Sequence, residues 1–252
     1  MYKMYGWLIV FSFLSITVAA QDAATLLEDG KKLEMKFKEE EAIVKYKQAL
    51  TSEPGNKQAL MKMSELSGNV GFRQTDAMLK SKYYREGFDY ATDLLKLDST
   101  SAEANWIAAT AYGRMVELDL KKDSLLTFIK AIKYYAEKSI GADPNFGRGY
   151  NLLGRWHYTM LTLNLIKRSA VRVLYGKFPE ANIDSAIVYL EKCKLLEQYY
   201  CSNYLDLGKA YNYKKQYEKA IAVLEQLAKL PTRRQDDPAI KKEGAALWQS
   251  LQ

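Results

Sequence analysis

The sequence predicts an all-α fold in which antiparallel helix pairs stack into a right-handed solenoid. The first observation is a repeated octet, since Tyr150-Asn-Leu-Leu-Gly-Arg-Trp-His157 returns 54 residues later as Tyr204-Leu-Asp-Leu-Gly-Lys-Ala-Tyr211. The second is that an alanine with a leucine four residues later follows each octet. These pairs are Ala186 with Leu190, and Ala220 with Leu224. The third is composition: 27% of residues are charged, and the 5 prolines mostly mark the ends of expected helices.

The spacing within the octet has a physical reason. Leu207, Gly208 and Tyr211 are three and four residues apart, so they share one helix face. A glycine inside a helix costs about 1 kcal/mol relative to alanine, and it is tolerated where a second helix must approach closely. Ala220 supplies the small facing residue. One such pair cannot bury its apolar stripe alone, so neighbouring pairs must stack.

This pattern resembles the tetratricopeptide (TPR) repeat, which carries Trp-x2-Leu-Gly-x2-Tyr followed by Ala-x3-Phe and a proline. We expect about five irregular TPR-like helix pairs and a C-terminal capping helix. The repeats are expected at about residues 23–56, 57–101, 102–146, 147–200 and 201–234, and the cap at 237–251. The expected repeat-packing residues are Gly30, Ala42, Tyr46, Ala109, Tyr112, Leu153, Gly154, Ala186, Leu190, Leu207, Gly208, Tyr211, Ala220 and Leu224.

The elements follow in order along residues 21–252, which we expect to form a single solenoid. The second repeat has a short first helix near 56–67 and a long second helix near 75–97. The third repeat opens at Ala102, and its second helix is expected near 123–140. Pro238 falls in the first turn of the capping helix, where its missing N–H costs little.

Residues 1–20 have the composition of a secretory signal peptide. A short segment with one lysine precedes an apolar run from Gly6 to Val18, and small residues follow at Ala19 and Ala20. We therefore expect export to a bacterial periplasm or cell envelope, or secretion. The alternative is a membrane anchor formed by an uncleaved N-terminal segment.

The basic residues are concentrated in one stretch. Between Pro144 and Pro179 there is no aspartate or glutamate, and this stretch accounts for the whole positive excess of the chain after residue 20. Its six basic residues are Arg148, Arg155, Lys167, Arg168, Arg172 and Lys177.

Part of this stretch, residues 161–178, is an insertion relative to a standard 34-residue repeat. On a helical projection the apolar residues Leu163, Ile166, Ala170, Val173 and Leu174 fall on one side. Lys167, Arg168 and Arg172 fall on the other. One interpretation is a basic helix that binds an anionic membrane surface, an acidic polymer or an acidic partner. The other is an extra helix whose apolar side packs on the solenoid.

Catalytic and metal-binding motifs are not found in the sequence. His157 is the only histidine, which excludes paired-histidine metal sites, and we expect its ring to pack between helices. Phosphate-binding loops and nucleophile elbows are also missing. Cys193 and Cys201 form either a disulfide or two separate thiols. We expect no enzyme activity, no cofactor and no nucleic-acid partner.

In TPR stacks the first helix of each pair lines the binding groove. The candidate groove residues are Tyr150, Arg155, Tyr158, Asn203, Asp206 and Asn212. The alternative for the aromatic residues is that they pack between helices.

A closer resemblance is carried by Gly154-Arg-Trp-His-Tyr158, the insertion ending at Pro179, Ala186-Ile and Leu205-Asp-Leu-Gly-Lys-Ala-Tyr211. These segments resemble the regulator of microtubule dynamics family. The resemblance implies an irregular TPR fold, an insertion of this kind, and a polar loop before a last helix. It also implies links to microtubules, spindle poles and organelle contacts, and it carries no defined catalytic residues.

The sequence thus indicates a non-enzymatic scaffold that binds an unknown protein or other macromolecule through its groove, its basic insertion or both. A regulator of microtubules, an adaptor at a membrane surface and a structural envelope component are the alternatives.

Overall fold

The structure is a computed structural model that describes residues 22–118, 122–163, 169, 171–173 and 180–252. These residues are predominantly α-helical, as the sequence predicts, and no strand occurs among them. They form two compact units, which divide the chain between Leu97 and Asp98. The single continuous solenoid over residues 21–252 stays a prediction. The signal peptide expected at 1–20 lies outside the described residues.

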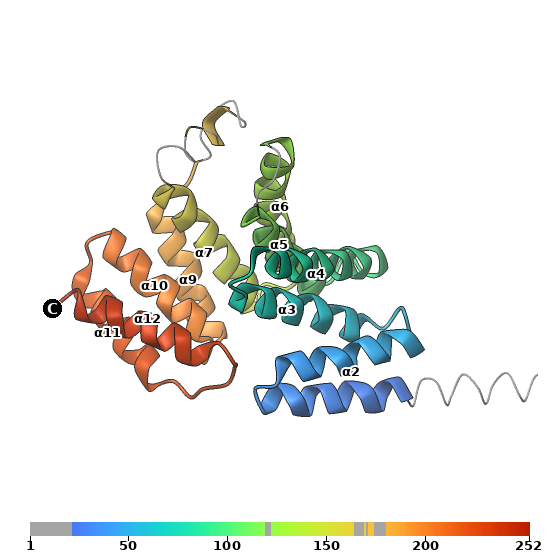
Figure 1. Cartoon of the computed structure of the whole chain (residues 1–252). Coiled ribbons are helices and arrows are strands. Elements are labelled where there is room, and N and C mark those ends of the chain that lie inside the picture. The colour runs from blue at the N-terminus through green and yellow to red at the C-terminus, as the bar shows by residue number, and fades with distance from the viewer. Residues whose placement is uncertain (1–21, 119–121, 164–168, 170, 174–179) are drawn as a thin grey trace, which may run out of the picture. The chain divides into compact units, whose positions relative to one another are not determined.

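The first unit contains two helix pairs. A helix over residues 22–35 pairs with α2 (Glu39–Ser52), and α3 (Lys57–Arg73) pairs with α4 (Ala77–Leu97), as Figure 1 shows. Phe37, in the turn between the helix over residues 22–35 and α2, has a φ of 58°. Asn56 caps α3 by accepting a hydrogen bond from the Ala59 N–H at 2.9 Å.

Small residues set the spacing within these pairs, as expected. A Cβ on Gly30 would lie 2.7 Å from the Tyr46 ring, so only glycine lets the first helix approach α2 this closely. The Tyr46 hydroxyl donates to Glu34, and the ring packs with Ala42, Met63 and other buried side chains of the unit. Glu34 also accepts from Lys62 of α3 at 2.9 Å, which links the two pairs.

The helix α3 is longer than the sequence predicts. The sequence predicts an end near residue 67, whereas the helix continues through Gly68 and Gly71 to Arg73. The physical reason is tertiary packing: Val70 is fully buried, and a Cβ on Gly71 would lie 2.7 Å from the Tyr84 ring of α4. Close packing against α4 outweighs the low helix propensity of glycine.

The described residues of the second unit form three helix pairs and a final helix; Figure 1 shows their arrangement. The pairs are α5 (Ala102–Val116) with α6 (Lys122–Ala142), α7 (Gly147–Thr162) with α9 (Ile183–Leu196), and α10 (Cys201–Tyr213) with α11 (Tyr217–Lys229). The first helices also touch one another, since α7 contacts both α5 and α10. The final helix α12 (Asp237–Gln249) packs on α10 and α11, which is the expected capping arrangement.

The repeated octet behaves as its spacing predicts. A Cβ on Gly154 would lie 2.5 Å from Leu190 and 3.0 Å from the Ala186 carbonyl oxygen. A Cβ on Gly208 would lie 2.7 Å from Leu224. Both glycines therefore let a second helix pack directly on the first.

The other predicted packing residues are also buried, with one exception. The fully or nearly fully buried ones are Ala42, Tyr46, Ala109, Leu153, Ala186, Leu190, Leu207, Tyr211, Ala220 and Leu224. Tyr112 is half-buried and packs its ring against Phe128 and Tyr135. These side chains lie in the contacts between paired helices.

The structure describes only part of the predicted amphipathic face of the insertion. Val173, which the helical projection places on the apolar side, is 80% exposed. Val171 is buried instead, against Ile129, Trp156 and Met160. Residues two apart on a helix point about 200° apart, so Val171 and Val173 cannot both face the core. The insertion therefore packs on the unit at Val171.

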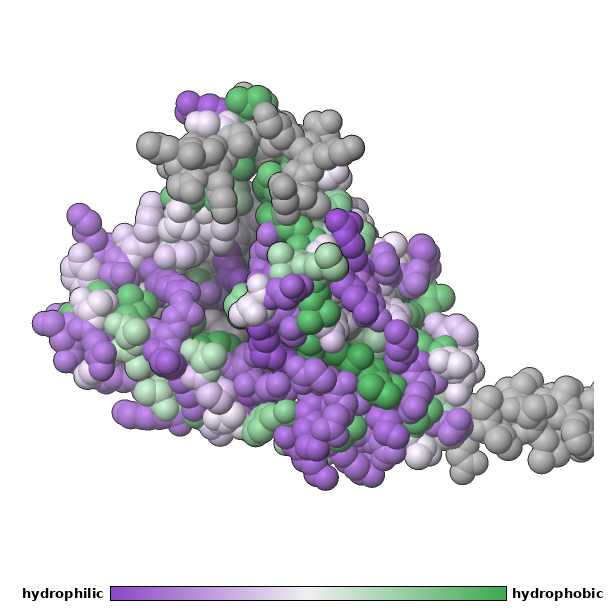
Figure 2. Space-filling model, in the orientation of Figure 1, coloured by the Kyte–Doolittle hydropathy of each residue, from purple (hydrophilic) through white to green (hydrophobic). Residues whose placement is uncertain are grey.

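Hydrophilic side chains predominate on the face shown in Figure 2, with smaller hydrophobic patches between them. Charged residues make up 27% of the sequence, which is typical of solvated helix faces. The packed side chains lie between the helices of each pair.

Candidate functional site

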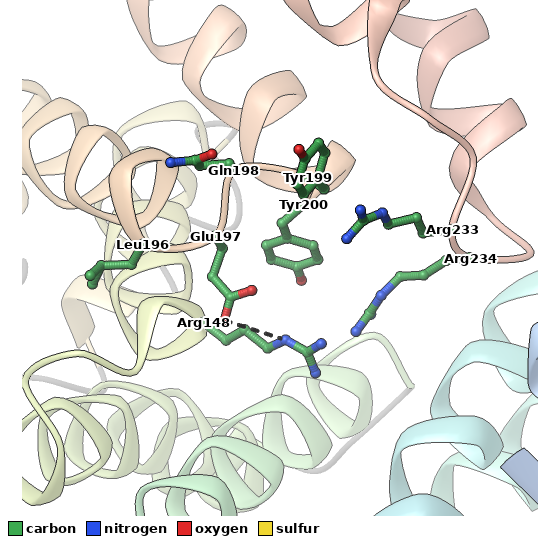
Figure 3. Close-up of a pocket in the computed structure, with 8 residues that line it drawn as sticks. All are labelled: Arg148, Leu196, Glu197, Gln198, Tyr199, Tyr200, Arg233 and Arg234. Carbon is green, nitrogen blue, oxygen red and sulfur yellow. Dashed lines mark ion pairs between the residues drawn. The ribbon is translucent and has the colours of Figure 1, made fainter.

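A pocket of about 460 Å³ opens at one end of the second unit. It lies where the start of α7, the α9–α10 turn and the α11–α12 loop meet (Figure 3). We call it the arginine pocket. Its lining residues are Arg148, Leu196, Glu197, Gln198, Tyr199, Tyr200, Arg233 and Arg234.

A buried carboxylate fixes the loop that carries two of the arginines. Asp237 is 1% exposed, and one of its oxygens accepts hydrogen bonds from the backbone N–H groups of Arg233 at 2.8 Å and Arg234 at 2.9 Å. Pro238 follows in the first turn of α12. The backbone that presents both guanidinium groups is therefore held before any ligand arrives.

A glycine lets the start of α7 and the α9–α10 turn, which form the rest of the pocket, lie close together. A Cβ on Gly147 would lie 2.4 Å from the Glu197 Cγ and 3.0 Å from the Leu196 Cβ. Because Gly147 has no side chain, the α9–α10 turn can approach the start of α7. This approach places Arg148 and Glu197 in the same pocket.

The arginine side chains lie against aromatic rings. The guanidinium of Arg148 lies 4.9 Å from the ring centre of Trp106 and 5.8 Å from that of Tyr200. Arg233 lies 3.8 Å from the Tyr199 ring centre. Figure 3 shows Arg148 and Arg234 reaching toward the space beside Tyr200 from different elements, and Arg234 is 5.2 Å from that ring. Such cation–π contacts orient a guanidinium group.

The charge of the pocket is positive. Glu197 is the one acidic residue of the lining, and its Oε1 lies 4.0 Å from Arg148 Nε. The lining carries three guanidinium groups and one carboxylate, so the formal charge of its side chains is +2. A site of this kind attracts anions.

A second group of polar residues links α7, α9 and α10. Arg155 Nε lies 3.5 Å from Asp206 Oδ2, and Asn151 Nδ2 donates to Asp206 at 3.1 Å and to Asn203 Oδ1 at 3.2 Å. Asn203 in turn donates to the Leu190 carbonyl oxygen at 2.9 Å. Burial raises the pKa of the Asp206 carboxyl, while Arg155 and Asn151 act in the opposite direction.

This network changes the interpretation of the predicted groove. The structure does bring Arg155, Asn203 and Asp206 together. However, Arg155 pairs with Asp206, and Asn151 donates to both Asp206 and Asn203. Asn203 is fully buried, so its side chain does not line an open surface. The correction follows from helix geometry, since Asn203 lies on the side of α10 that faces α9.

The other predicted site residues are dispersed. Tyr150 donates to the Pro144 carbonyl oxygen at 3.1 Å, Tyr158 packs its ring against Tyr213, and Asn212 is half-buried on α10. Arg172 is exposed beside the buried Val171. Lys167, Arg168 and Lys177 lie outside the described residues.

Of the predicted binding residues only Arg148 lines the arginine pocket. Sequence reasoning did not select Glu197, Tyr199, Tyr200, Arg233 or Arg234. The adjacent Arg233 and Arg234 in the polar loop before α12 could have been recognised as candidate binding residues. Their proximity to Arg148 could not, because Arg148 and Arg233 are 85 residues apart in sequence.

His157 packs as expected. It is 8% exposed, its ring stacks on that of Tyr189, and its Nδ1 accepts a hydrogen bond from the Asn182 N–H at 3.2 Å. Burial is the main cause that lowers its pKa, and Lys133 adds to it. Asn182 is the N-cap of α9, so His157 supports the start of that helix.

The two cysteines are separate buried thiols. Burial raises the pKa of Cys201 to about 11 and that of Cys193 further. Thiols of this kind are protonated at neutral pH and are poor nucleophiles.

The described residues contain neither a metal-binding cluster nor a helix suited to span a membrane. There is no group of three or more histidine, cysteine, aspartate or glutamate side chains there that could hold a metal ion. Among the helices of that same part of the chain, none combines the length and the apolar character that crossing a membrane requires.

Comparison with solved structures supports the fold. A thermophilic TPR protein from Thermus thermophilus superposes with a TM-score of 0.63 at 14% sequence identity, covering 89% of this chain and 98% of that one. At this identity the likeness shows the fold alone. The chain therefore has a TPR-like fold, as its repeated octet predicts.

Comparison with sequences shows the family. Regulator of microtubule dynamics protein 1 from Caenorhabditis elegans is 28% identical over 185 residues, which are 73% of this chain and 79% of that protein. The protein of the same name from Mus musculus is 26% identical over 214 residues, which are 83% of this chain and 67% of that protein. The family model described as Regulator of microtubule dynamics protein 1-3 matches residues 26–252. This chain therefore belongs to the regulator of microtubule dynamics family.

Proposed function

We propose that this chain is a non-enzymatic scaffold that binds a protein partner through the arginine pocket of its second unit. The observation that carries the proposal is the convergence of Arg148, Arg233 and Arg234 on one open pocket. TPR-like folds present such surfaces from the ends and inner faces of stacked helices. The partner is unknown, and no cofactor is part of the proposal.

The arginine pocket is a better binding site than the polar face of α7 and α10. On that face Asp206 pairs with Arg155 and accepts from Asn151, and Asn203 bonds to Asn151 and Leu190, so a ligand would compete with these internal contacts. In the pocket, Tyr199 is 47% exposed and Arg233 is exposed, and both can contact a partner without rearrangement. Exposed tyrosine and arginine are the residue types that contribute most at interfaces.

Site-specific photo-crosslinking tests the proposal. A photoreactive benzoylphenylalanine replaces Tyr199, and a control protein carries it at Tyr217, which is 48% exposed on α11 outside the pocket. Both proteins are irradiated in the native host, and adducts are identified by mass spectrometry. The proposal expects a discrete adduct from Tyr199 only. Adducts from both positions, or from neither, would contradict it.

A microtubule-associated role is the second candidate function, and family membership favours it. The relatives whose names refer to microtubule dynamics cover most of this chain. Co-sedimentation of the full chain with stabilised microtubules tests it. Retention in the supernatant at every microtubule concentration would rule this role out.

An adaptor role at an anionic membrane surface is the third candidate. The insertion presents Val173, which is 80% exposed, next to the exposed Arg172. An exposed apolar residue beside a basic one suits the boundary of an anionic bilayer. Flotation with anionic liposomes tests this role, with Val173→Ser and Arg172→Ser expected to reduce the bound fraction.

Export to the cell envelope or secretion is also part of the proposal. It rests on the composition of residues 1–20. N-terminal sequencing of the protein from its native host tests it: a start after Ala20 supports export with cleavage, and a start at Met1 contradicts it.

A further inference from the structure

We infer that the arginine pocket binds an acidic peptide segment, one that presents neighbouring glutamate or aspartate carboxylates. This inference rests on the proposed function and names the chemistry of the partner. It is carried by the charge of the pocket, the fixed loop that supplies two arginines, and the position of Glu197.

The choice of carboxylate follows from the donors. Each guanidinium presents N–H groups in a flat fork that matches the two oxygens of a carboxylate. Arg148 comes from α7, and Arg233 and Arg234 come from the loop before α12. Because the donors lie on two separate elements, a ligand with two or more carboxylates can engage both walls at once.

The pocket is prepared for such a ligand. Asp237 holds the backbone of Arg233 and Arg234, and the Tyr199 and Tyr200 rings support their guanidinium groups at 3.8 and 5.2 Å. Less conformational entropy is then lost when an anion binds.

A peptide fits this lining better than an isolated anion does. The aromatic faces of Tyr199 and Tyr200 and the apolar side chain of Leu196 lie between the charged groups. They can contact the methylene groups and backbone of a chain segment. A single small anion would leave these contacts unused.

Glu197 acts as an internal competitor for the ligand. Its carboxylate lies 4.0 Å from Arg148 Nε, an ion pair drawn as a dashed line in Figure 3. An incoming carboxylate would replace it there. Removing the charge of Glu197 should therefore strengthen binding.

The test measures binding of a fluorescent peptide that contains a run of glutamates, with the same peptide carrying glutamines as the control. Fluorescence anisotropy on the full chain is expected to give about tenfold tighter binding of the glutamate peptide. The double variant Arg233→Glu/Arg234→Glu is expected to lose about tenfold in affinity. Lys229→Glu/Lys242→Glu makes the same change in net charge at exposed positions outside the pocket, and it should bind like wild type.

The Glu197→Gln variant adds a gain-of-binding test, with an expected improvement of about threefold or more. The milder pair Arg233→Gln/Arg234→Gln and circular dichroism of every variant separate a loss of binding from a loss of folding. Equal affinity for the two peptides, or equal losses in the pocket and control variants, would overturn the inference. So would pocket-dependent flotation with phosphatidylserine vesicles without peptide binding, because the pocket would then take a lipid headgroup.

The outcomes also separate this inference from the proposed function. A Tyr199 adduct in cells without binding of the acidic peptide would leave the scaffold role standing and reject the acidic ligand. Peptide binding without any Tyr199 adduct would support the chemistry of the pocket and contradict its use by a protein partner.

Discussion

Glycines mark the closest contacts in this protein at the scale of single residues. Gly154 and Gly208 take the same position in the repeated octet, and in both the missing Cβ leaves room for a leucine of the paired helix. Two other helical glycines have no such role. A Cβ on Gly113 or Gly141 would meet nothing within 4 Å.

This contrast gives the first prediction. Gly154→Ala should lower the free energy of unfolding by about 1–3 kcal/mol, because overpacking against Leu190 and the Ala186 carbonyl exceeds the gain in helix propensity. Gly113→Ala and Gly141→Ala should instead raise it by up to about 1 kcal/mol, since they gain propensity without a clash. Urea denaturation measures all three. A loss of equal size in each would show that the contact distances do not decide the outcome.

His157 gives a prediction for pH. Its folded pKa is lowered by burial and by Lys133, against a smaller opposing effect of Glu137, from an ordinary value of 6.5. The unfolded chain therefore binds the proton more readily, and stability must fall as pH drops below about 6.5 toward the folded pKa. The His157→Phe variant cannot titrate, and it also loses the acceptor for the Asn182 N–H.

The variant should be less stable than wild type by about 1 kcal/mol above pH 6.5, and the difference should shrink as pH falls. Melting temperatures of both proteins across this pH range provide the measurement. A constant difference between them at every pH would mean that His157 does not titrate in this range.

At the scale of elements, buried polar side chains hold the first helices of adjacent repeats together. Asn151 of α7 donates to Asp206 and Asn203 of α10, and Asn203 donates to the Leu190 carbonyl oxygen of α9. Asn151→Ala would leave a half-buried carboxylate and a buried amide without their donor. It should cost about 1–3 kcal/mol. Asn212→Ala, at a half-buried position on the same helix α10, should change stability by less than about 0.5 kcal/mol.

The α11–α12 loop depends on one carboxylate. Asp237→Ala removes the acceptor for the Arg233 and Arg234 N–H groups and should lower stability by about 1–2 kcal/mol. It should also weaken binding of the glutamate peptide, because the two arginines would no longer be held. Asp237→Asn keeps a side-chain oxygen and should recover part of both losses. Binding unchanged in Asp237→Ala would show that the loop needs no fixed backbone.

At the scale of the whole molecule, the contacts divide the chain into two compact units at Leu97 and Asp98. In a solenoid each repeat contacts mainly its neighbours, so a group of complete repeats can fold by itself. We predict that residues 98–252 expressed alone remain helical and unfold cooperatively. Circular dichroism and thermal melting test this. A fragment without a cooperative transition would show that the second unit requires the first.

Much of the fold was predictable because the repeats are local. The spacing of Leu207, Gly208 and Tyr211, with Ala220 and Leu224 after them, requires one helix to pack on the next. Where the structure differs from the expected elements, residues distant in the sequence are the cause. Packing against Tyr84 of α4 keeps Gly71 within α3, and the core around Trp156 buries Val171 rather than Val173.

The sequence by itself determined the helix pairs, their order and the family, because these depend on short-range periodicity and on motifs of a few residues. Only the tertiary structure decided the candidate site. Arg148, Glu197 and Arg233 lie far apart in the chain, and they meet because Gly147 admits the α9–α10 turn and Asp237 folds the last loop over it. The tertiary structure also decided that the Asn203 side chain is buried. Which polar residues face one another depends on helix rotation and loop paths, and local spacing does not specify either.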